Sequence, residues 1–387
     1  MNKGLKKIGH EVGFLHTKDG NPRNGEGSFV RLKNGDILHA YTEYYGDGWA
    51  DHCTARISAC FSHDDGDSFE PPFILFEKDE RAENIMSVSL FRMNNGEIGC
   101  VYLRKERKPN GNITCMPLFR SSADEAQSWS EPIEFSLPDG YYCVINDGVI
   151  VQRNGRILVP ASLHGDSCDT IFDANGNVLM EQGGVIMVCA SDDNGRSWQR
   201  LDSVIRSPYK DTTGFGEPGL YEFENGDLWL WFRSAYGHQY QTYSRDNGKT
   251  WAPVAPNFCF TSPDAPMRVK KMGKYTVAIF NPLSYNVLRT DYSARKNTKR
   301  TPFVCAVSVD DGHSFDTTGK TFAAGALAYF AESSYLLEDD YKDSYCYPAI
   351  LETKDGFIVS YYHSDGSDYT LNSEKISKVY FSELEEN

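Results

Sequence analysis

The sequence predicts an all-β fold, a single six-bladed β-propeller domain that covers residues 1–387. Two internal repeats and the composition support this prediction. Aromatic residues make up 13% of the chain, with 23 Tyr and 22 Phe, and these residue types favour strands. Repeats at a regular spacing indicate that one small unit of secondary structure recurs along the chain.

The first repeat is a polar turn string of the form Ser-x-Asp-x-Gly-x-Ser/Thr-aromatic. Its five copies start 53 to 69 residues apart and lie at Ser62–Phe69, Ser122–Trp129, Ser191–Trp198, Ser244–Trp251 and Ser308–Phe315. Asp and Ser side chains bond the backbone of tight turns, and Gly supplies a positive φ, although the second copy has Ala126 instead. We interpret the strings as scaffold, in which each final aromatic is buried against its own repeat, and not as catalytic sites.

The second repeat is a short hairpin turn before an apolar strand, as in KNGDIL and ENGDLW. Its six copies are centred on Gly35, Gly96, Gly155, Gly226, Gly273 and Gly356. Asn-Gly and Asp-Gly between apolar runs indicate β-hairpins. Because there are six hairpins but five turn strings, the last blade lacks one strand. We expect Glu11–Thr17 to supply this strand beside residues 375–384, which closes the ring and protects the sheet edge.

The composition argues against several classes of function. The net charge of −15 disfavours nucleic acid or an anionic membrane as a partner. The ten Cys residues form no CxxC pair and the nine His residues form no HExxH motif, so neither a metal nor another cofactor is expected. The segment MNKGLKKIGHEVGF lacks the apolar centre of a signal peptide, and no run of 18 apolar residues occurs. We therefore expect a cytoplasmic protein with reduced thiols.

Polar residues mark one mouth of the predicted channel. The innermost strand of each blade runs along the channel, so residues at equal distances from the hairpin glycines gather at the same mouth. The residues nine positions before these glycines are all polar: Glu26, Ser87, Asn146, Glu217, Asp264 and Tyr347. The following strand returns to the mouth at Glu43, Arg104, His164, Arg233 and His363. Converging polar groups in a concave mouth predict a binding site there.

Several segments resemble the sialidase superfamily, and the turn strings are similar to its Asp-boxes, which join outer strands of propeller blades. GEPGLYEFENGDLWLWFRS resembles the sialidase segment with the catalytic Glu and one Arg of the carboxylate-binding triad, which fall on Glu217 and Arg233. SYCYPAILETKDG is similar to the segment with the nucleophilic Tyr, which falls on Tyr347. The resemblance covers nearly the whole chain and implies the same fold and a related activity.

Two further segments complete the resemblance. GWADHCTARISACFSHDDG is similar to the stretch that carries the acid/base Asp, which implies Asp51 with Asp47 as the second choice. KRTPFVCAVSVDDG is similar to the segment that carries a later Arg of the triad, which implies Arg300.

The resemblance implies retaining hydrolysis of a terminal acidic sugar, a sialic or related ulosonic acid, from a small glycan or glycoconjugate. The substrate carboxylate would repel an Asp or Glu nucleophile, whereas Tyr347 avoids this if Glu217 takes its proton. Asp51 would protonate the leaving oxygen and then activate water. Arg233 and Arg300 would bind the carboxylate. The other residues expected to bind substrate at this mouth are Glu26, Asn146, Asp264, Arg104 and His164.

One segment departs from the family pattern. Sialidases begin with an Arg-Ile-Pro motif whose Arg is the first of the triad, but NGEGSFVRLKNG places Glu26 there. Arg31 is too close to the turn to replace that Arg, and Arg23 is a neighbour. A Glu at this position repels a carboxylate or pairs with an Arg, so we expect altered specificity.

Two other functions stay open at this point. One is a uronate-acting propeller enzyme, a hydrolase or a lyase, that uses His164 or His363 with Tyr347. The other is a glycan-binding propeller without catalysis, although such a module has no need of a paired Tyr and Glu.

Overall fold

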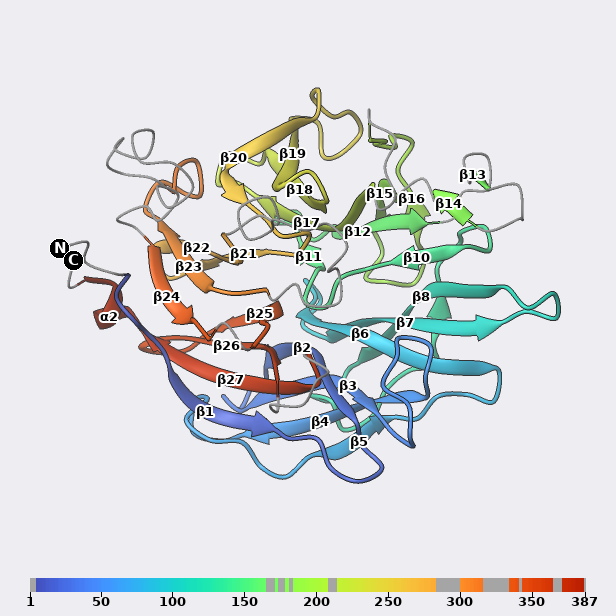
Figure 1. The fold of residues 1–387 in the computed structure, drawn as a ribbon, viewed down its shortest axis with the longest axis horizontal. Coiled ribbons are helices and arrows are strands. Elements are labelled where there is room, and N and C mark those ends of the chain that lie inside the picture. The colour runs from blue at the N-terminus through green and yellow to red at the C-terminus, as the bar shows by residue number, and fades with distance from the viewer. Residues whose placement is uncertain are drawn as a thin grey trace.

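The computed structural model describes residues 5–164, 171–172, 178–180, 184–207, 214–282, 300–315, 334–340, 343–364 and 371–385. Strands dominate this part of the chain, which agrees with the predicted all-β class. Its helical segment is the short helix α2 (Phe381–Glu385) near the C-terminus. Figure 1 shows the sheets arranged around a common centre, with β2, β6, β11, β17, β21 and β25 innermost.

Four sheets contain four strands each, and most neighbours in a sheet are consecutive in the chain. The first sheet consists of β2 (Arg23–Arg31), β3 (Ile37–Tyr44), β4 (Ala55–Ser62) and β5 (Phe73–Phe76). The second consists of β17 (Phe215–Glu222), β18 (Leu228–Ser234), β19 (His238–Ser244) and β20 (Ala255–Thr261). The third consists of β21 (Arg268–Met272), β22 (Tyr275–Phe280), β23 (Phe303–Ser308) and β24 (Ser334–Glu338). The fourth consists of β25 (Cys346–Glu352), β26 (Gly356–His363), β27 (Ser373–Tyr380) and β1 (His10–Leu15).

A larger sheet of nine strands joins two antiparallel runs. The first run consists of β6 (Ala82–Arg92), β7 (Ile98–Arg107), β8 (Ile113–Ser122) and β9 (Ile133–Glu134). The second consists of β11 (Ile150–Val151), β12 (Ile157–His164), β15 (Val185–Ser191) and β16 (Gln199–Arg200). The short β10 (Tyr141–Cys143) joins them, because it pairs parallel with β8 and antiparallel with β12. A separate pair is formed by β13 (Ile171–Phe172) and β14 (Val178–Met180).

The N-terminal segment pairs with the last strand of the chain, as the sequence predicts. β1 runs antiparallel to β27, with His10 opposite Lys378 and Leu15 opposite Glu374. Figure 1 shows the blue β1 beside the red β27 at the outer rim. The first strand of the chain therefore covers an edge of the C-terminal sheet that would otherwise expose unpaired backbone groups.

We expect deletion of residues 1–17 to cause self-association, because it uncovers the backbone edge of β27. Light scattering and size-exclusion chromatography of the truncated and full-length chains at equal concentration measure this effect. A truncated chain that stays monomeric with an unchanged melting temperature would contradict the closing role of β1.

The turn strings are built by hydrogen bonds that repeat from copy to copy. In the first string, the Ser62 hydroxyl accepts a hydrogen bond from the Gly66 amide, and Asp64 accepts one from the Ser68 amide, both at 2.9 Å. The corresponding Ser and Asp residues of the other four strings make the same bonds. The Asp side chains are thus occupied in holding the turns, which supports their interpretation as scaffold.

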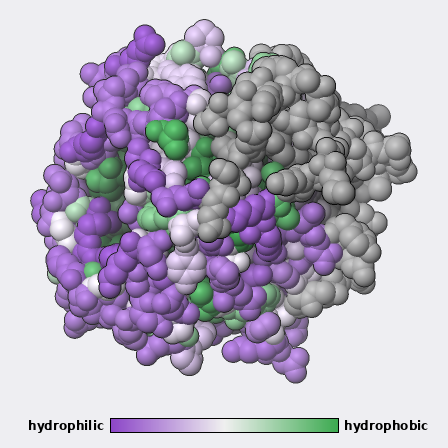
Figure 2. Space-filling model, turned by 90° about the vertical axis from the view of Figure 1, so that its left-hand side faces the viewer, coloured by the Kyte–Doolittle hydropathy of each residue, from purple (hydrophilic) through white to green (hydrophobic). Residues whose placement is uncertain are grey.

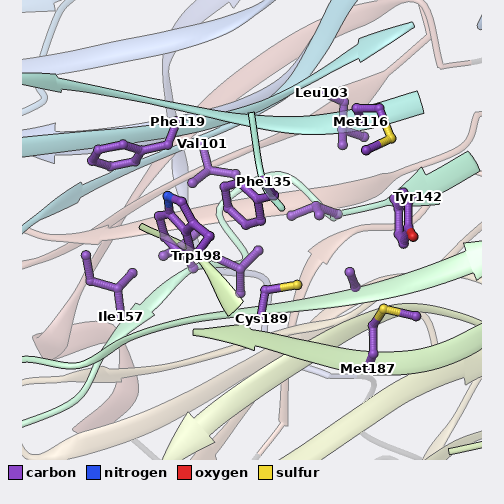
Figure 3. Close-up of a cluster of buried hydrophobic side chains, with 14 of the residues drawn as sticks. Val101, Leu103, Met116, Phe119, Phe135, Tyr142, Ile157, Met187, Cys189 and Trp198 are labelled. Carbon is purple, nitrogen blue, oxygen red and sulfur yellow. The ribbon is translucent and has the colours of Figure 1, made fainter. Parts of the chain in front are cut away.

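The final aromatics of the strings are buried to different extents. Trp198 is 5% exposed and stacks on Phe135 with ring centroids 4.1 Å apart, inside the apolar cluster drawn in Figure 3. Trp251 is only half-buried, at the edge of another cluster. The expectation of a buried anchor therefore holds better for Trp198 than for Trp251.

We expect Trp198→Ala to destabilise the protein by roughly 3 kcal/mol or more, since it empties a packed site. Trp251→Ala is the matched control and should cost less, because that indole is already partly in solvent. Chemical denaturation measures both. Loss of ligand binding by Trp198→Ala at unchanged stability would contradict the scaffold interpretation.

Candidate active site

A strained residue near the start of each innermost strand aims side chains at one mouth. The residues with positive φ are Glu26 (57°), Ser87 (56°), Asp147 (54°), Glu217 (42°), Asp264 (58°) and Tyr347 (56°). Non-glycine residues rarely adopt this conformation, and a bulge with it redirects the local side chains. The strand register shifts at four of these positions, in β2, β6, β17 and β25. Such recurring strain is typical of functional sites.

Four of these residues, Glu26, Ser87, Glu217 and Tyr347, line a cavity of about 300 Å³. Its lining includes four cationic side chains, three carboxylates and two tyrosines: Arg23, Lys105, Arg233, Arg300, Glu26, Asp51, Glu217, Tyr141 and Tyr347. The lining also has an apolar part, which includes Met86, Leu103, Val144 and Leu371. The cavity therefore suits a polar, anionic ligand that also has some apolar surface.

Tyr347 and Glu217 form the central contact of the cavity. The Tyr347 hydroxyl donates to Glu217 Oε1 at 2.5 Å. Arg233 Nη1 donates to Glu217 Oε2 at 2.5 Å and lies 3.4 Å from the Tyr347 hydroxyl oxygen. Burial and the Glu217 charge raise the pKa of Tyr347 well above its usual value, against the opposing charges of Arg233 and Arg300. Tyr347 is therefore protonated in the empty site, with a carboxylate placed to take its proton.

Asp264 holds the two arginines of this half of the cavity. Its carboxylate lies 3.0 Å from Arg233 Nε, and its backbone oxygen accepts a bond from Arg300 Nη2 at 3.0 Å. Arg300 Nη1 also lies 3.1 Å from Cys346 Sγ, and the guanidinium lies 5.8 Å from the centre of the Tyr347 ring. Asp264 is not among the residues that line the cavity, so it holds both arginines from behind.

Arg23 organises the opposite half of the cavity. It donates from Nη2 to Glu26 Oε1 at 3.0 Å and from Nη1 to Asp51 Oδ1 at 2.5 Å. Its guanidinium lies between the rings of Tyr44 and Tyr362, 4.6 and 5.1 Å from their centroids. The Arg that the resemblance to sialidases implies at position 26 is absent, but an Arg three residues earlier reaches the same cavity. Glu26 and Asp51 together neutralise it.

The two carboxyl groups beside Arg23 have pKa values shifted in opposite directions. Burial raises the pKa of Glu26, and the charge of Arg23 opposes this only in part. Burial also favours protonation of Asp51, but the charges of Arg23 and Lys105 outweigh it and lower the pKa of Asp51. The Ser87 hydroxyl also donates to Glu26 Oε2, so Glu26 is held on both oxygens.

A family model identifies the family of this chain. The model of the BNR repeat-like domain matches residues 81–360, more than half of the chain. The chain belongs to the BNR repeat-like family. No curated protein sequence matches this member significantly.

Solved structures of similar fold include proteins of known and unknown function. A protein of unknown function from Dyadobacter fermentans has a TM-score of 0.69 at 17% identity, with 97% of this chain and 99% of that chain covered. The Hadza microbial sialidase Hz136 has a TM-score of 0.65 at 16% identity, with 96% and 68% covered. The sialidase of Trypanosoma rangeli, in complex with 2,3-difluorosialic acid as a covalent intermediate, has a TM-score of 0.66 at 14% identity, with 99% and 60% covered.

Some residues of this BNR repeat-like protein that the sequence places at the mouth lie elsewhere. Arg104 is 6% exposed and pairs with Glu134 at 2.5 Å, outside the cavity lining, whereas the next residue, Lys105, lines the cavity. Successive side chains of a strand point to opposite faces, so a shift of one residue exchanges the two. That alternation was the signal that could have identified Lys105.

The third repeat shows a similar shift. Asn146 is fully buried, and its amide donates to the backbone oxygens of Gly27 and Tyr347 at 2.8 and 3.2 Å. The residue with positive φ is Asp147, which pairs with Lys270 at 2.6 Å. Asn146 thus holds neighbouring innermost strands together and is not among the residues that line the cavity.

The two histidines considered for a lyase also lie outside the cavity lining. His164 Nε2 lies 2.9 Å from the Ser162 hydroxyl, and burial together with the charge of Arg233 lowers its pKa to about 4. His363 Nδ1 lies 3.0 Å from an oxygen of Asp343. Neither imidazole is placed as the partner of Tyr347 that the lyase alternative requires.

Among the remaining acidic and basic candidates, one lines the cavity and the others lie outside its lining. Asp51 lines the cavity with 61% of its side chain exposed, whereas Asp47 is exposed and lies outside the lining. Arg31 pairs with Asp65 at 2.7 Å, also outside the lining, so it cannot replace the missing Arg. Glu43 pairs with Arg56 at 3.1 Å.

In the described part of the chain, no group of three or more His, Cys, Asp or Glu side chains is placed to hold a metal ion. None of the helices in the same residues is long and apolar enough to cross a membrane. Figure 2 shows that the face turned toward the viewer is largely hydrophilic where it is coloured.

Proposed function

We propose that this protein is a retaining glycoside hydrolase that cleaves a terminal acidic sugar, a sialic or related ulosonic acid, from a small glycan or glycoconjugate. The observation that carries the proposal is the 2.5 Å contact between the Tyr347 hydroxyl and Glu217. A buried tyrosine in direct contact with a carboxylate in a charged cavity suits nucleophilic catalysis better than passive binding.

In the first step, the Tyr347 oxygen attacks the anomeric carbon while Glu217 accepts its proton. The bond to the leaving oxygen breaks, and Asp51 supplies the proton that this oxygen needs. In the second step, Asp51 takes a proton from water, which attacks the same carbon. The bond from this carbon to the Tyr347 oxygen breaks, and Glu217 returns its proton to that oxygen. The sialidase of Trypanosoma rangeli, which has a similar fold, forms a covalent intermediate with 2,3-difluorosialic acid, and this supports a two-step reaction here.

Arg233 and Arg300 are the proposed ligands of the substrate carboxylate. Both line the cavity on the side of Tyr347, and Asp264 holds both from behind. Charge-assisted bonds from two guanidinium groups fix a carboxylate strongly, and they would place the anomeric carbon next to Tyr347. Arg23 contributes less, because two carboxylates already occupy it.

We also infer a six-bladed propeller formed by one domain over residues 1–387. The four sheets of four strands each count as one blade. The nine-stranded sheet counts as two blades, β6–β9 and the run from β11 to β16, which β10 joins. Six positive-φ residues, one at the start of each blade, support this count.

A substrate screen tests the proposal. Aryl glycosides of sialic acids, other ulosonic acids and uronic acids are incubated with the protein, and the released sugar is identified by NMR. We expect hydrolysis of an ulosonic acid glycoside with retention of the anomeric configuration. Release of an unsaturated sugar, inversion, or binding without cleavage of any compound would contradict the proposal.

A further inference from the structure

Two buried side chains grip the loop that carries Asp51, which connects β3 and β4 and spans residues 45–54. Asn84 of β6 donates from Nδ2 to the backbone oxygens of Asp51 and Cys53, both at 2.8 Å. Lys105 of β7 donates from Nζ to the same Asp51 oxygen at 2.7 Å. Asn84 is 0% and Lys105 2% exposed. Both donors come from the sheet next to the one that contains the loop, so the contact fixes the loop relative to the cavity.

Arg23 holds the same loop from the other side. It donates to the Trp49 backbone oxygen at 3.3 Å and to the Asp51 side chain at 2.5 Å. Within the loop, the Cys53 amide donates to the Ala50 oxygen at 2.8 Å. That internal bond shapes the turn but does not determine where the turn lies over the cavity. The bonds from Asn84, Lys105 and Arg23 do.

The position of Lys105 is costly unless it serves the site. Its ammonium lies 5.5 Å from the centre of the Tyr141 ring, and its hydrogen bond goes to a backbone oxygen and not to a carboxylate. Burying an ammonium group away from water is unfavourable unless hydrogen bonds compensate. An apolar residue would satisfy the packing alone, so the charged donor serves the Asp51 loop and the cavity that Lys105 lines.

We propose that Lys105 and Asn84 are positioning residues that hold Asp51 at the leaving-group side of the cavity. The inference rests on the proposed function, since Asp51 is the group that protonates the leaving oxygen there. Small displacements of a catalytic group reduce its contribution strongly, so two buried anchors on one carbonyl are a reasonable means to prevent them.

Lys105 is charged and Asn84 is neutral. Variants of the two therefore separate the effect of the position of Asp51 from the effect of a neighbouring charge on it. The charged groups that face Asp51 are Arg23 and Glu26 of β2, Lys105 of β7 and His52 of the loop itself. Lys105 lowers the pKa of Asp51 as well as holding its backbone, whereas Asn84 carries no charge. Removal of Lys105 should therefore raise the pKa of Asp51, and removal of Asn84 should leave it unchanged.

The test compares Lys105→Met and Asn84→Ala with the wild type on a 4-nitrophenyl sialoside and a methyl sialoside. The aryl group leaves without help, but the alkyl group needs the proton from Asp51. We expect kcat/KM to fall on the order of 10²-fold for the methyl sialoside and less than about 3-fold for the aryl sialoside in both variants. The high-pH limb of the profile should move to higher pH in Lys105→Met only. Arg107→Met, which removes an exposed charge from the same strand, is the control. It should leave kcat/KM for both sialosides unchanged.

Hydrogen exchange of the loop provides a readout that does not depend on activity. In both variants the amides of residues 49–53 should exchange faster than in the wild type, while the rest of β6 and β7 is unchanged. Unchanged exchange in both variants, or equal losses on the two sialosides, would overturn the inference. A wild type that cleaves neither sialoside would instead count against the proposed function, and the exchange result would still decide the role of the anchors.

Discussion

Tyr347→Phe should lower kcat/KM on the order of 10³-fold or more for any glycoside that the wild type cleaves. Only the hydroxyl is lost, and with it both the proposed nucleophile and the contact to Glu217. Losses of this size are typical when the attacking group of a covalent mechanism is removed. The fold should persist, because the ring itself keeps its position above Arg300 and beside Tyr362. Steady-state kinetics and circular dichroism measure the two effects.

Tyr361→Phe is the matched control for this prediction. Tyr361 is more deeply buried than Tyr347, and its hydroxyl donates to Glu338 at 2.7 Å, outside the cavity lining. Its loss should reduce stability by about 1 kcal/mol or slightly more and leave turnover unchanged. A Tyr347→Phe variant that releases sugar at the parent rate would remove the nucleophile from the proposed mechanism. In that case the alternative of a water nucleophile, with Tyr347 as a binding residue only, would have to be considered.

Counting nine residues back from each hairpin glycine predicted much of the candidate site, for a physical reason. A repeat with hairpins of equal length keeps each innermost strand in the same register, so counting back from the turn reaches the same height in each repeat. Glu217 and Tyr347 were found in this way, and their predicted contact is present at 2.5 Å. The same count also identified Glu26, Ser87 and Asp264, all with positive φ. The positive φ of these residues could not be predicted, because in a sequence it is mainly Gly that indicates a positive φ.

The residues that the sequence placed wrongly or missed also have a physical explanation. Lys105, not Arg104, lines the cavity, and Asp147, not Asn146, has the positive φ. A single extra residue in a strand or turn is enough to exchange neighbours, and counting from the hairpin glycines alone does not reveal it. Arg23 was named only as a neighbour of the mouth, because its approach depends on the tertiary position of Tyr44 and Tyr362 on two different strands. The joining of two antiparallel runs through β10 depends on pairing between distant segments, which the repeat does not encode.

Glu26→Gln should strengthen the binding of an acidic sugar, with KM lower by about 5- to 10-fold at neutral pH. Glu26 lies 3.0 Å from Arg23 and offsets its charge inside the cavity. The amide of Gln has nearly the same shape but no charge, so the cavity loses one negative charge and Arg23 is paired with Asp51 alone, which reduces the repulsion of the substrate carboxylate. Restoring the family residue by Glu26→Arg is less favourable, since a second guanidinium would be buried against Arg23 without a carboxylate between them.

The pH dependence provides the sharper form of this prediction. Burial raises the pKa of Glu26, so on acidification its carboxylate is neutralised earlier than an ordinary Glu would be. As pH falls through this raised pKa, the wild type should bind the acidic sugar more tightly and approach the Gln variant, in which this dependence is absent. Calorimetry with a non-hydrolysed acidic sugar across this pH range measures the effect without interference from Asp51 protonation during turnover. Glu43→Gln is the control, because that carboxylate also pairs with an arginine, Arg56, but lies outside the cavity lining. Equal or weaker binding by Glu26→Gln at all pH values would show that Glu26 does not limit the carboxylate site, and the missing family Arg would then have no consequence for specificity.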